Sequence, residues 1–334
     1  MVAPSESLKA GVDYPKNWGQ FMDWFHSDEA CRQYLERLRW PEGFVCPKCE
    51  HRDEPIRSTR GRLQCRRCKH QASVTAGTIF DKTRTQLRTW FAAIWYVTNQ
   101  KQGVNALGLQ RVLGLGSYET AWTMLHRLRR AMVRPGRDQL RGEVEVDETF
   151  VAIGDRKSPI SPVGIKSNTS MVLVAVAVEI VQPKGFGRIR LRRIERSDQR
   201  TLESFIQDAV APGSLIHSDG SPAYRNVKDI GYGHRQTVHL GSGTPAHESM
   251  PGVHRVAALL QRWLLGTHHG AVQPGQLDYY LDEFVFRFNR RTSASRGLLF
   301  YRLLQQAVVT EPVTYEMVAT KQSRCTNLPM HNWP

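Results

Sequence analysis

The sequence lacks any apolar run of about 18 residues, the length that a membrane-spanning helix needs, so no such span is expected. Its first ten residues, MVAPSESLKA, lack a basic patch followed by an apolar stretch, so we expect no secretory signal. A cytoplasmic protein with reduced thiols follows as the default expectation.

Acidic side chains are also comparatively few. There are 31 Asp and Glu residues against 46 Lys and Arg residues, which gives a net charge of +15. Such an excess favours a polyanionic partner, and nucleic acid is the first choice among polyanions. The alternative is a soluble protein that is merely basic.

Cysteine is scarce, yet four of the six cysteines form two Cys-x-x-Cys pairs: Cys46 and Cys49 in CPKC, and Cys65 and Cys68 in CRRC. The spacing is typical of a four-thiolate zinc site. Two such pairs close a tetrahedral shell and leave no position for water, so one structural Zn²⁺ is expected. The short polar segment between the pairs could not fold without the metal. Two disulfides or unrelated thiols are the disfavoured alternative.

Two regions predict contacts with DNA. Residues 85–134 have helical periodicity with a break at 114–116, and Ser117 or Thr120 is a candidate cap for the second helix. This pattern fits a helix-turn-helix, although a helical hairpin that only packs is about as common. The predicted DNA-contacting side chains are Arg66, Arg67 and Lys69 beside the second cysteine pair, and Arg127, Arg129 and Arg130 at the end of the second helix.

After a linker at 134–142 the pattern changes to strands. EVEVDETFVAI alternates, SMVLVAVAVEI is continuously apolar, and RIRLRRIE alternates again; a helix and the short strand GSLIHSDG follow. Three strands, a helix, a strand and further helices match a ribonuclease H-like layout, a mixed sheet with helices on its faces. That layout places Asp147 on the first strand beside Asp219 at the end of the fourth.

Two adjacent carboxylates are suited to hold two divalent ions that act on a phosphodiester. Each aspartate also has a structural alternative. Asp147 could face solvent from an alternating strand, as Glu143 and Glu145 would on the same face, and Asp219 could be a turn former. Glu148 would point to the opposite face. A third ligand is expected from the helix VHRVAALLQRW, where His254 and Gln261 share a face because seven residues span nearly two turns.

These motifs together resemble bacterial insertion-sequence transposases that have an N-terminal zinc ribbon and a DDE-type, ribonuclease H-like core. The stretches that carry the resemblance are RLRWPEGFVCPKC, QASVTAGTIF, YETAWTMLHRLRRAM, GEVEVDETFV, HSDG, VHRVAALLQRWLLGTHHGAV and LDEFVFRFNRRTS. The resemblance implies that Asp147 and Asp219 fill the first two catalytic positions. It implies that His254 fills the third, where Glu or Asn is usual, and that Gln261 replaces a usual Lys.

Both departures have chemical consequences. Imidazole suits Mg²⁺ poorly and Mn²⁺ better, so among the two candidate catalytic ions Mn²⁺ should support stronger cleavage. Gln261 lacks the positive charge that would hold a DNA phosphate, and Arg262 is the nearest residue that could compensate. His254 could instead be a helix-start residue with no ligand role. His247 and Glu248 are fallback ligands.

The expected organisation is a mixed multidomain α+β protein. Its parts are an N-terminal helical segment (1–42), the zinc ribbon (43–80), the helix-turn-helix-like segment (81–140), the ribonuclease H-like domain (141–305) and a C-terminal tail (306–334).

The favoured function is a DNA transposase that acts on double-stranded element ends and target DNA as a homodimer or larger oligomer, associated with the bacterial nucleoid. The rivals are a catalytically impaired, transposase-derived DNA-binding protein and a zinc-ribbon nuclease or repair factor without strand transfer.

Overall fold

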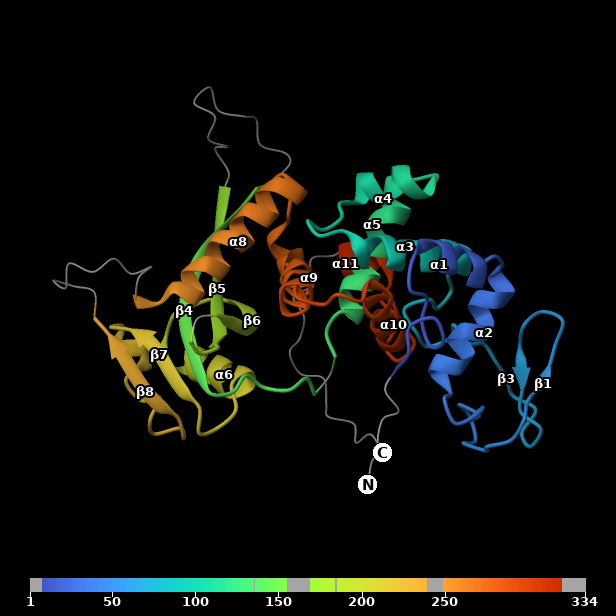
Figure 1. Cartoon of the computed structure of the whole chain (residues 1–334), viewed down its shortest axis with the longest axis horizontal. Helices are drawn as coiled ribbons and strands as arrows, with labels where there is room; N and C mark the ends of the chain where they lie inside the picture. Colours follow the sequence, from blue (N-terminus) through green and yellow to red (C-terminus); the bar gives the residue numbers. More distant parts are fainter. Residues whose placement is uncertain (1–7, 135, 155–168, 184, 239–248, 320–334) are drawn as a thin grey trace. The chain divides into compact units, whose positions relative to one another are not determined.

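The computed structural model describes residues 8–134, 136–154, 169–183, 185–238 and 249–319 (Figure 1). The chain divides into two compact units, Met1–Arg134 with Thr292–Tyr315, and Pro135–Arg291 with Glu316–Pro334. We call them the N-terminal unit and the C-terminal unit. Within the described ranges, no helix combines the length and the apolar character needed to cross a bilayer.

The N-terminal unit is a set of helices that carries a small three-stranded sheet. Its helices are α1 (Trp18–Trp24), α2 (Asp28–Arg39), α3 (Leu87–Asn99), α4 (Ala106–Leu113), α5 (Tyr118–Ala131) and α10 (Arg296–Ala307), and α11 (Tyr315–Ala319) begins at its last residue. Its strands are β1 (Ile56–Arg57), β2 (Leu63–Gln64) and β3 (Gln71–Ala72), paired antiparallel in that order.

Helices α4 and α5 form the predicted helix pair with a turn between them. Helix α4 ends at Gly114, whose φ of 62° is a left-handed conformation that glycine adopts at little cost. Ser117 then caps α5 by accepting a hydrogen bond from the Thr120 amide, so it is the cap among the two candidates. The glycine-containing break is therefore the turn of a helix-turn-helix-like pair.

Helix α10 packs in the N-terminal unit, whereas the sequence grouped it with the C-terminal domain up to residue 305. The Phe300 side chain is fully buried and lies edge-on to Phe21 and Phe91, with ring centroids 5.5 and 5.8 Å away. Because aromatic rings bury a large apolar area, these contacts fix which unit the helix joins. The C-terminal unit's main segment consequently ends at Arg291.

The C-terminal unit contains a five-stranded mixed sheet. Its elements are β4 (Glu143–Gly154), β5 (Thr169–Ile180), β6 (Phe186–Ile194), α6 (Gln199–Ala209), β7 (Leu215–Asp219), η1 (Pro222–Tyr224), β8 (Gly233–Thr237), α8 (Pro251–His268), η2 (Pro274–Gln276) and α9 (Leu277–Asn289). The strand order is β6-β5-β4-β7-β8. Strands β4, β5 and β6 are antiparallel, while β7 runs parallel to both β4 and β8. This is the predicted ribonuclease H-like mixed sheet.

Alternation along β4 gives each face of the sheet its own core. Val151 and Ile153 face one cluster, which includes Val256 and Leu260 of α8 and aromatic residues of α9. Val144 and Val146 face the other, which α6 and η1 complete. Side chains on a strand alternate between faces, so Glu145 and Asp147 share the α8 face. In Figure 1, α8 lies along the β4 and β5 part of the sheet.

Candidate functional site

The two predicted catalytic aspartates lie at equivalent places on adjacent parallel strands. The pairing of β4 with β7 brings Glu145 opposite His217. Asp147 and Asp219 each stand two residues beyond that pair on their own strand. Both side chains are half-buried. The strand register therefore brings the two carboxylates to one end of the β4–β7 pair.

The electrostatic surroundings of Asp147 are crowded with negative charge. Burial is the largest cause that raises its pKa, to about 7, and the charges of Glu148, Asp219 and Glu145 raise it further. The Glu148 amide donates to the Asp147 carboxylate at 2.8 Å and opposes this rise. A cation bound nearby would favour the charged form of this carboxyl group.

Asp219 combines a turn with this acidic neighbourhood. Its carboxylate accepts a hydrogen bond from the Ser221 amide at 3.0 Å, which is the turn-forming contact expected of an Asp-Gly pair. Glu148 lies on the other face of β4, as predicted from alternation, and accepts hydrogen bonds from the hydroxyls of Tyr224 and Ser197. Tyr224 is fully buried, so this contact ties the turn after Asp219 back to β4.

Helix α8, which carries the third predicted ligand, is held on β4 at two points. At its start, the Val253 amide donates to the carboxylate of Glu145 at 2.9 Å. Two turns later, the Gln261 side-chain amide donates to the Phe150 carbonyl at 3.1 Å. Asp147 lies between these two positions on the strand. His254, which follows Val253 directly, is half-buried at the start of the helix.

Glu145 is buried, although alternation along the strand is also compatible with a solvent-facing position. It is only 3% exposed, because α8 covers this face. Burial raises its pKa, and the amides of Val253 and Gly252 act in the opposite direction as hydrogen-bond donors. Alternation in the sequence indicates the face but not what covers it.

Four thiols form a second candidate metal centre, in the N-terminal unit. Sγ atoms of Cys46 and Cys68 are 3.6 Å apart, and those of Cys49 and Cys65 are 3.7 Å apart. Four sulfurs at about 2.3 Å from one tetrahedral zinc ion would be about 3.8 Å apart, so the set fits zinc. Phe44 and the strands of the ribbon pack around it.

The predicted catalytic ligands of the C-terminal unit, Asp147, Asp219 and His254, are arranged differently from the four thiols. The four cysteine sulfurs all lie within 4.8 Å of one another. Among the described residues, they are the one group of at least three His, Cys, Asp or Glu side chains that could hold a metal ion. Asp147, Asp219 and His254 do not form such a group. The fallback ligands His247 and Glu248 lie outside the described residues.

The predicted DNA-contacting arginines of α5 fall into two groups. Arg129 is 2% exposed, and its guanidinium lies 3.3 Å from the His126 ring. Arg127 is half-buried and donates to the carbonyls of Val313, Ile79 and Asp81. Both guanidinium groups support the fold in this structure and are not presented to a phosphate. Arg130, on the same helix, is partly exposed.

Some exposed Lys and Arg side chains are the DNA contacts that the sequence predicted, and others were not predicted. Arg66, Arg67 and Lys69 are exposed on the ribbon and Arg262 is exposed on α8, although Arg66 also donates to the Glu54 carbonyl. A hollow of about 490 Å³ beside α5 is lined by the exposed Lys82 and Arg84 together with hydroxyl side chains and Glu119. The stretch DKTRT carries these two cations, and its mixture of basic and hydroxyl residues was the available signal.

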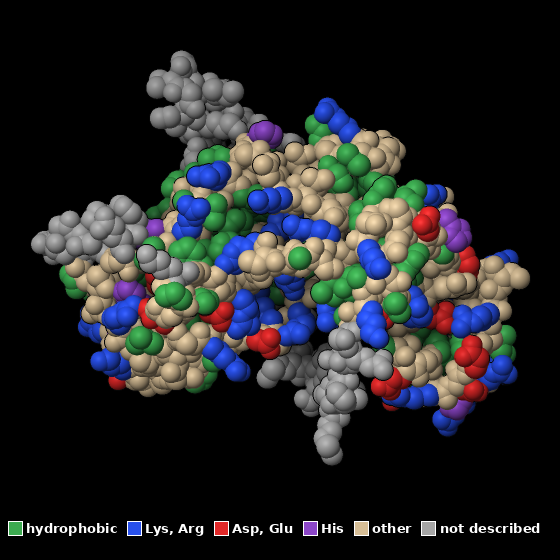
Figure 2. Space-filling view, in the orientation of Figure 1, with side chains coloured by type: hydrophobic (Ala, Val, Ile, Leu, Met, Phe, Trp, Pro, Cys, Tyr) green, Lys and Arg blue, Asp and Glu red, His purple; other side chains and the backbone are tan. Residues whose placement is uncertain are grey.

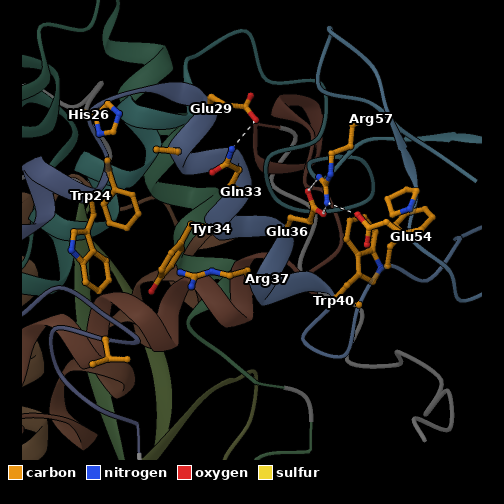
Figure 3. Close-up of a pocket in the computed structure, with 16 residues that line it drawn as sticks. Trp24, His26, Glu29, Gln33, Tyr34, Glu36, Arg37, Trp40, Glu54 and Arg57 are labelled. Carbon is orange, nitrogen blue, oxygen red and sulfur yellow. Dashed lines mark hydrogen bonds and ion pairs between the residues drawn. The ribbon is translucent and has the colours of Figure 1, made fainter.

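A larger hollow of about 890 Å³, shown in Figure 3, joins α2 to the ribbon. Arg57 forms two 2.8 Å hydrogen bonds with the Glu36 carboxylate and reaches Glu54 at 3.3 Å. Arg37 lies over the Tyr34 ring, 5.0 Å from its centroid. The charged side chains that line this hollow are therefore largely paired with one another, and none of the predicted site residues lines the hollow. On the face seen in Figure 2, Lys and Arg are interspersed with Asp and Glu around the ribbon.

Comparisons with known proteins match one segment in each unit. Residues 139–289 match the ISXO2-like transposase domain, and residues 26–71 match the transposase zinc-ribbon domain. The chain is 24% identical over 277 residues to an uncharacterized protein in transposable element ISH50 of Halobacterium salinarum, covering 79% of this chain and 91% of that protein. The catalytic core domain of BIV integrase is similar at 16% identity with a TM-score of 0.27, covering 42% of this chain and 80% of that one. The chain thus contains a segment that matches a transposase domain and a segment that matches a transposase zinc ribbon, which confirms the resemblance that its motifs indicated.

Proposed function

We propose that the protein is a DNA transposase that binds the terminal inverted repeats of an insertion sequence, cleaves a strand and transfers the freed end to target DNA. The observation that carries the proposal is the convergence on β4 of Asp147, beside Asp219, and of the start of α8, beside Glu145. It occurs within the segment that matches a transposase domain.

The acidic end of β4 fits a divalent cation. Burial and the charges of Glu148, Asp219 and Glu145 raise the pKa of Asp147 to about 7, so a bound cation would stabilise its charged form. Asp147, Asp219 and His254 would hold Mg²⁺ or Mn²⁺, two ions in all. When bound, such ions activate the attacking oxygen and stabilise charge on the leaving oxygen of a phosphodiester.

The reaction needs two in-line displacements at phosphorus. In the first, a water oxygen displaces the 3′-oxygen of the scissile phosphodiester, which leaves with a proton as a 3′-hydroxyl. In the second, that hydroxyl oxygen displaces a 3′-oxygen in target DNA, so one phosphodiester forms as another breaks. The chain's contribution is to position these groups, because no covalent protein intermediate is required. Glu148 and Tyr224 hold the turn that follows Asp219.

DNA binding would use exposed cations of both units. The candidates are Arg66, Arg67 and Lys69 on the zinc-loaded ribbon, Lys82, Arg84 and Arg130 around α5, and Arg262 on α8. Such contacts hold phosphates and set the register of the protein on the duplex. Cutting two element ends in concert implies at least a dimer.

A nicking assay tests the proposal. Full-length, zinc-loaded protein is incubated with Mn²⁺ and a duplex that carries an element end. Wild type should nick at the end, whereas Asp147→Ala and Asp219→Ala should bind the duplex without nicking it. Glu143→Gln is the matched control, because this carboxylate on the same strand pairs with Arg235. Wild-type nicking by Asp147→Ala would refute the proposal.

One observation favours a second candidate, a DNA-binding protein with impaired catalysis. Gln261 stands where the resemblance places a Lys, and its amide is donated to the Phe150 carbonyl. Wild type would then bind ends and leave strands intact, and Gln261→Lys would restore nicking. Under the favoured proposal, wild type is active and Gln261→Lys retains or increases the activity, because Lys adds a charge that attracts a phosphate.

A further inference from the structure

We propose that Glu145, with Gly252, is the docking point that positions His254 beside Asp147. The inference rests on the proposed function, because it assigns the two residues a role in assembling that same site. Neither residue would touch substrate or metal; each would act through the placement of α8.

Helix α8 lacks a side-chain cap of its own. Met250 occupies the cap position and makes no such hydrogen bond, and Pro251 at the first position has no N–H to satisfy. The next two amides, of Gly252 and Val253, donate hydrogen bonds to the buried carboxylate of Glu145. The Val253 nitrogen lies 2.9 Å from the Glu145 Oε2 atom. A strand residue therefore supplies the cap that the local sequence omits, and a negative charge there also suits the helix dipole.

Gly252 makes this contact close. A Cβ at this position would lie 2.8 Å from the Glu145 Oε2 atom, 3.1 Å from Ile180 Cδ1 and 3.2 Å from Val178 Cγ1. The first turn of α8 thus lies directly against β4 and β5, and an added Cβ would displace the Glu145 carboxylate from the helix start and press on Ile180 and Val178. Gly266, in the same helix, has no atom within 4 Å of an equivalent Cβ.

The placement of His254 relative to Asp147 depends on this contact and on short stretches of chain. His254 is two residues after Gly252 on a rigid helix, and Asp147 is two residues after Glu145 on the same sheet face. The other anchor of α8, at Gln261 and Phe150, lies beyond Asp147 along the strand. Loss of the first anchor would consequently let the His254 end of the helix move while the far end stays attached.

The decisive comparison is Gly252→Ala against Gly266→Ala in the full-length, zinc-loaded protein. Two quantities are measured: the dissociation constant for Mn²⁺, from free Mn²⁺ in a titration, and the rate of nicking on an element end. Both substitutions raise helix propensity alike, but only the first disturbs the docking. We expect Gly266→Ala to match wild type and Gly252→Ala to lose about 10- to 100-fold in Mn²⁺ affinity or rate, as for other residues that orient metal ligands.

Substitutions of Glu145 test the same contact independently. Glu145→Gln keeps an oxygen that can accept an amide hydrogen bond, so it should retain more Mn²⁺ affinity than Glu145→Ala, with end binding and helical circular dichroism unchanged. Wild-type Mn²⁺ affinity and nicking in both Gly252→Ala and Glu145→Ala would overturn the inference and leave the proposed function intact. A wild type that neither binds Mn²⁺ nor nicks would refute the proposed function and the inference together.

Discussion

Substituting Asp147 by Asn should make the metal-free C-terminal unit more stable at alkaline pH. Burial and neighbouring carboxylates raise the folded-state pKa of Asp147 to about 7 from its ordinary value of 3.8, so the folded protein binds a proton that the unfolded chain has released. An acid with a raised folded pKa costs stability as pH rises, from the unfolded value up to the folded one. Asn carries no charge and can still accept the Glu148 amide hydrogen bond.

The magnitude follows from the width of that pH window. Each pH unit between 5 and 7 costs wild type about 1.4 kcal/mol, so the advantage of Asp147→Asn should grow by about 2.7 kcal/mol between pH 5 and pH 8. Asp147 is partly exposed, and solvent screening reduces this to about 2 kcal/mol. For a unit of this size the corresponding shift in Tm is about 4–8 °C.

The assay is thermal unfolding at pH 5 and pH 8, in metal-depleted buffer without a chelator so that the thiol site keeps its zinc. Mn²⁺ should stabilise wild type at pH 8 and have a much smaller effect on Asp147→Asn. Glu143→Gln serves as control, because that carboxylate is already paired with Arg235. If Asp147→Asn is no more stable than wild type at pH 8, or if its stability advantage is equal at both pH values, the electrostatic reasoning is refuted.

Three further predictions concern metals and DNA. Nicking should be faster with Mn²⁺ than with Mg²⁺, because His254 offers nitrogen to the ion; equal or faster turnover with Mg²⁺ in a metal-exchange assay would argue against it as a direct ligand. Cys65→Ser should unfold the ribbon and weaken binding of element ends, seen in gel shifts, while Mn²⁺ binding by the C-terminal unit persists; full end binding would contradict the role of zinc. Lys82→Ala and Arg84→Ala should each lower the slope of log K against log salt by about 0.9, and an unchanged slope would remove that residue from the DNA contacts.

The sequence predicted the features that depend on spacing. Cys-x-x-Cys pairs have local geometry, so the meeting of the thiols could be inferred before their 3.6 and 3.7 Å separations were known. Alternation likewise identified β4 as a strand and assigned Asp147 and Glu148 to opposite faces. Whether His254 and Gln261 serve the chemistry stays a prediction.

Features that depend on tertiary packing were not accessible from the sequence. Arg127 and Arg129 end a helix in a basic protein, a pattern shared by DNA-binding and structural arginines, and only burial separates the two. Glu145 resembles a solvent-facing strand residue until α8 covers it. Helix α10 has an apolar face, but nothing in its local pattern identifies the N-terminal unit as its partner.

The central claim is that Asp147, Asp219 and His254 share divalent ions, and pulsed electron paramagnetic resonance of bound Mn²⁺ tests it most directly. The zinc of the ribbon is silent in this measurement. Wild type should show a ¹⁴N coupling from a directly bound imidazole, His254→Ala should lose that coupling while still binding Mn²⁺, and Asp147→Ala should bind much less Mn²⁺. A Mn²⁺ signal without nitrogen coupling in wild type, or with the same coupling in His254→Ala, would contradict the account.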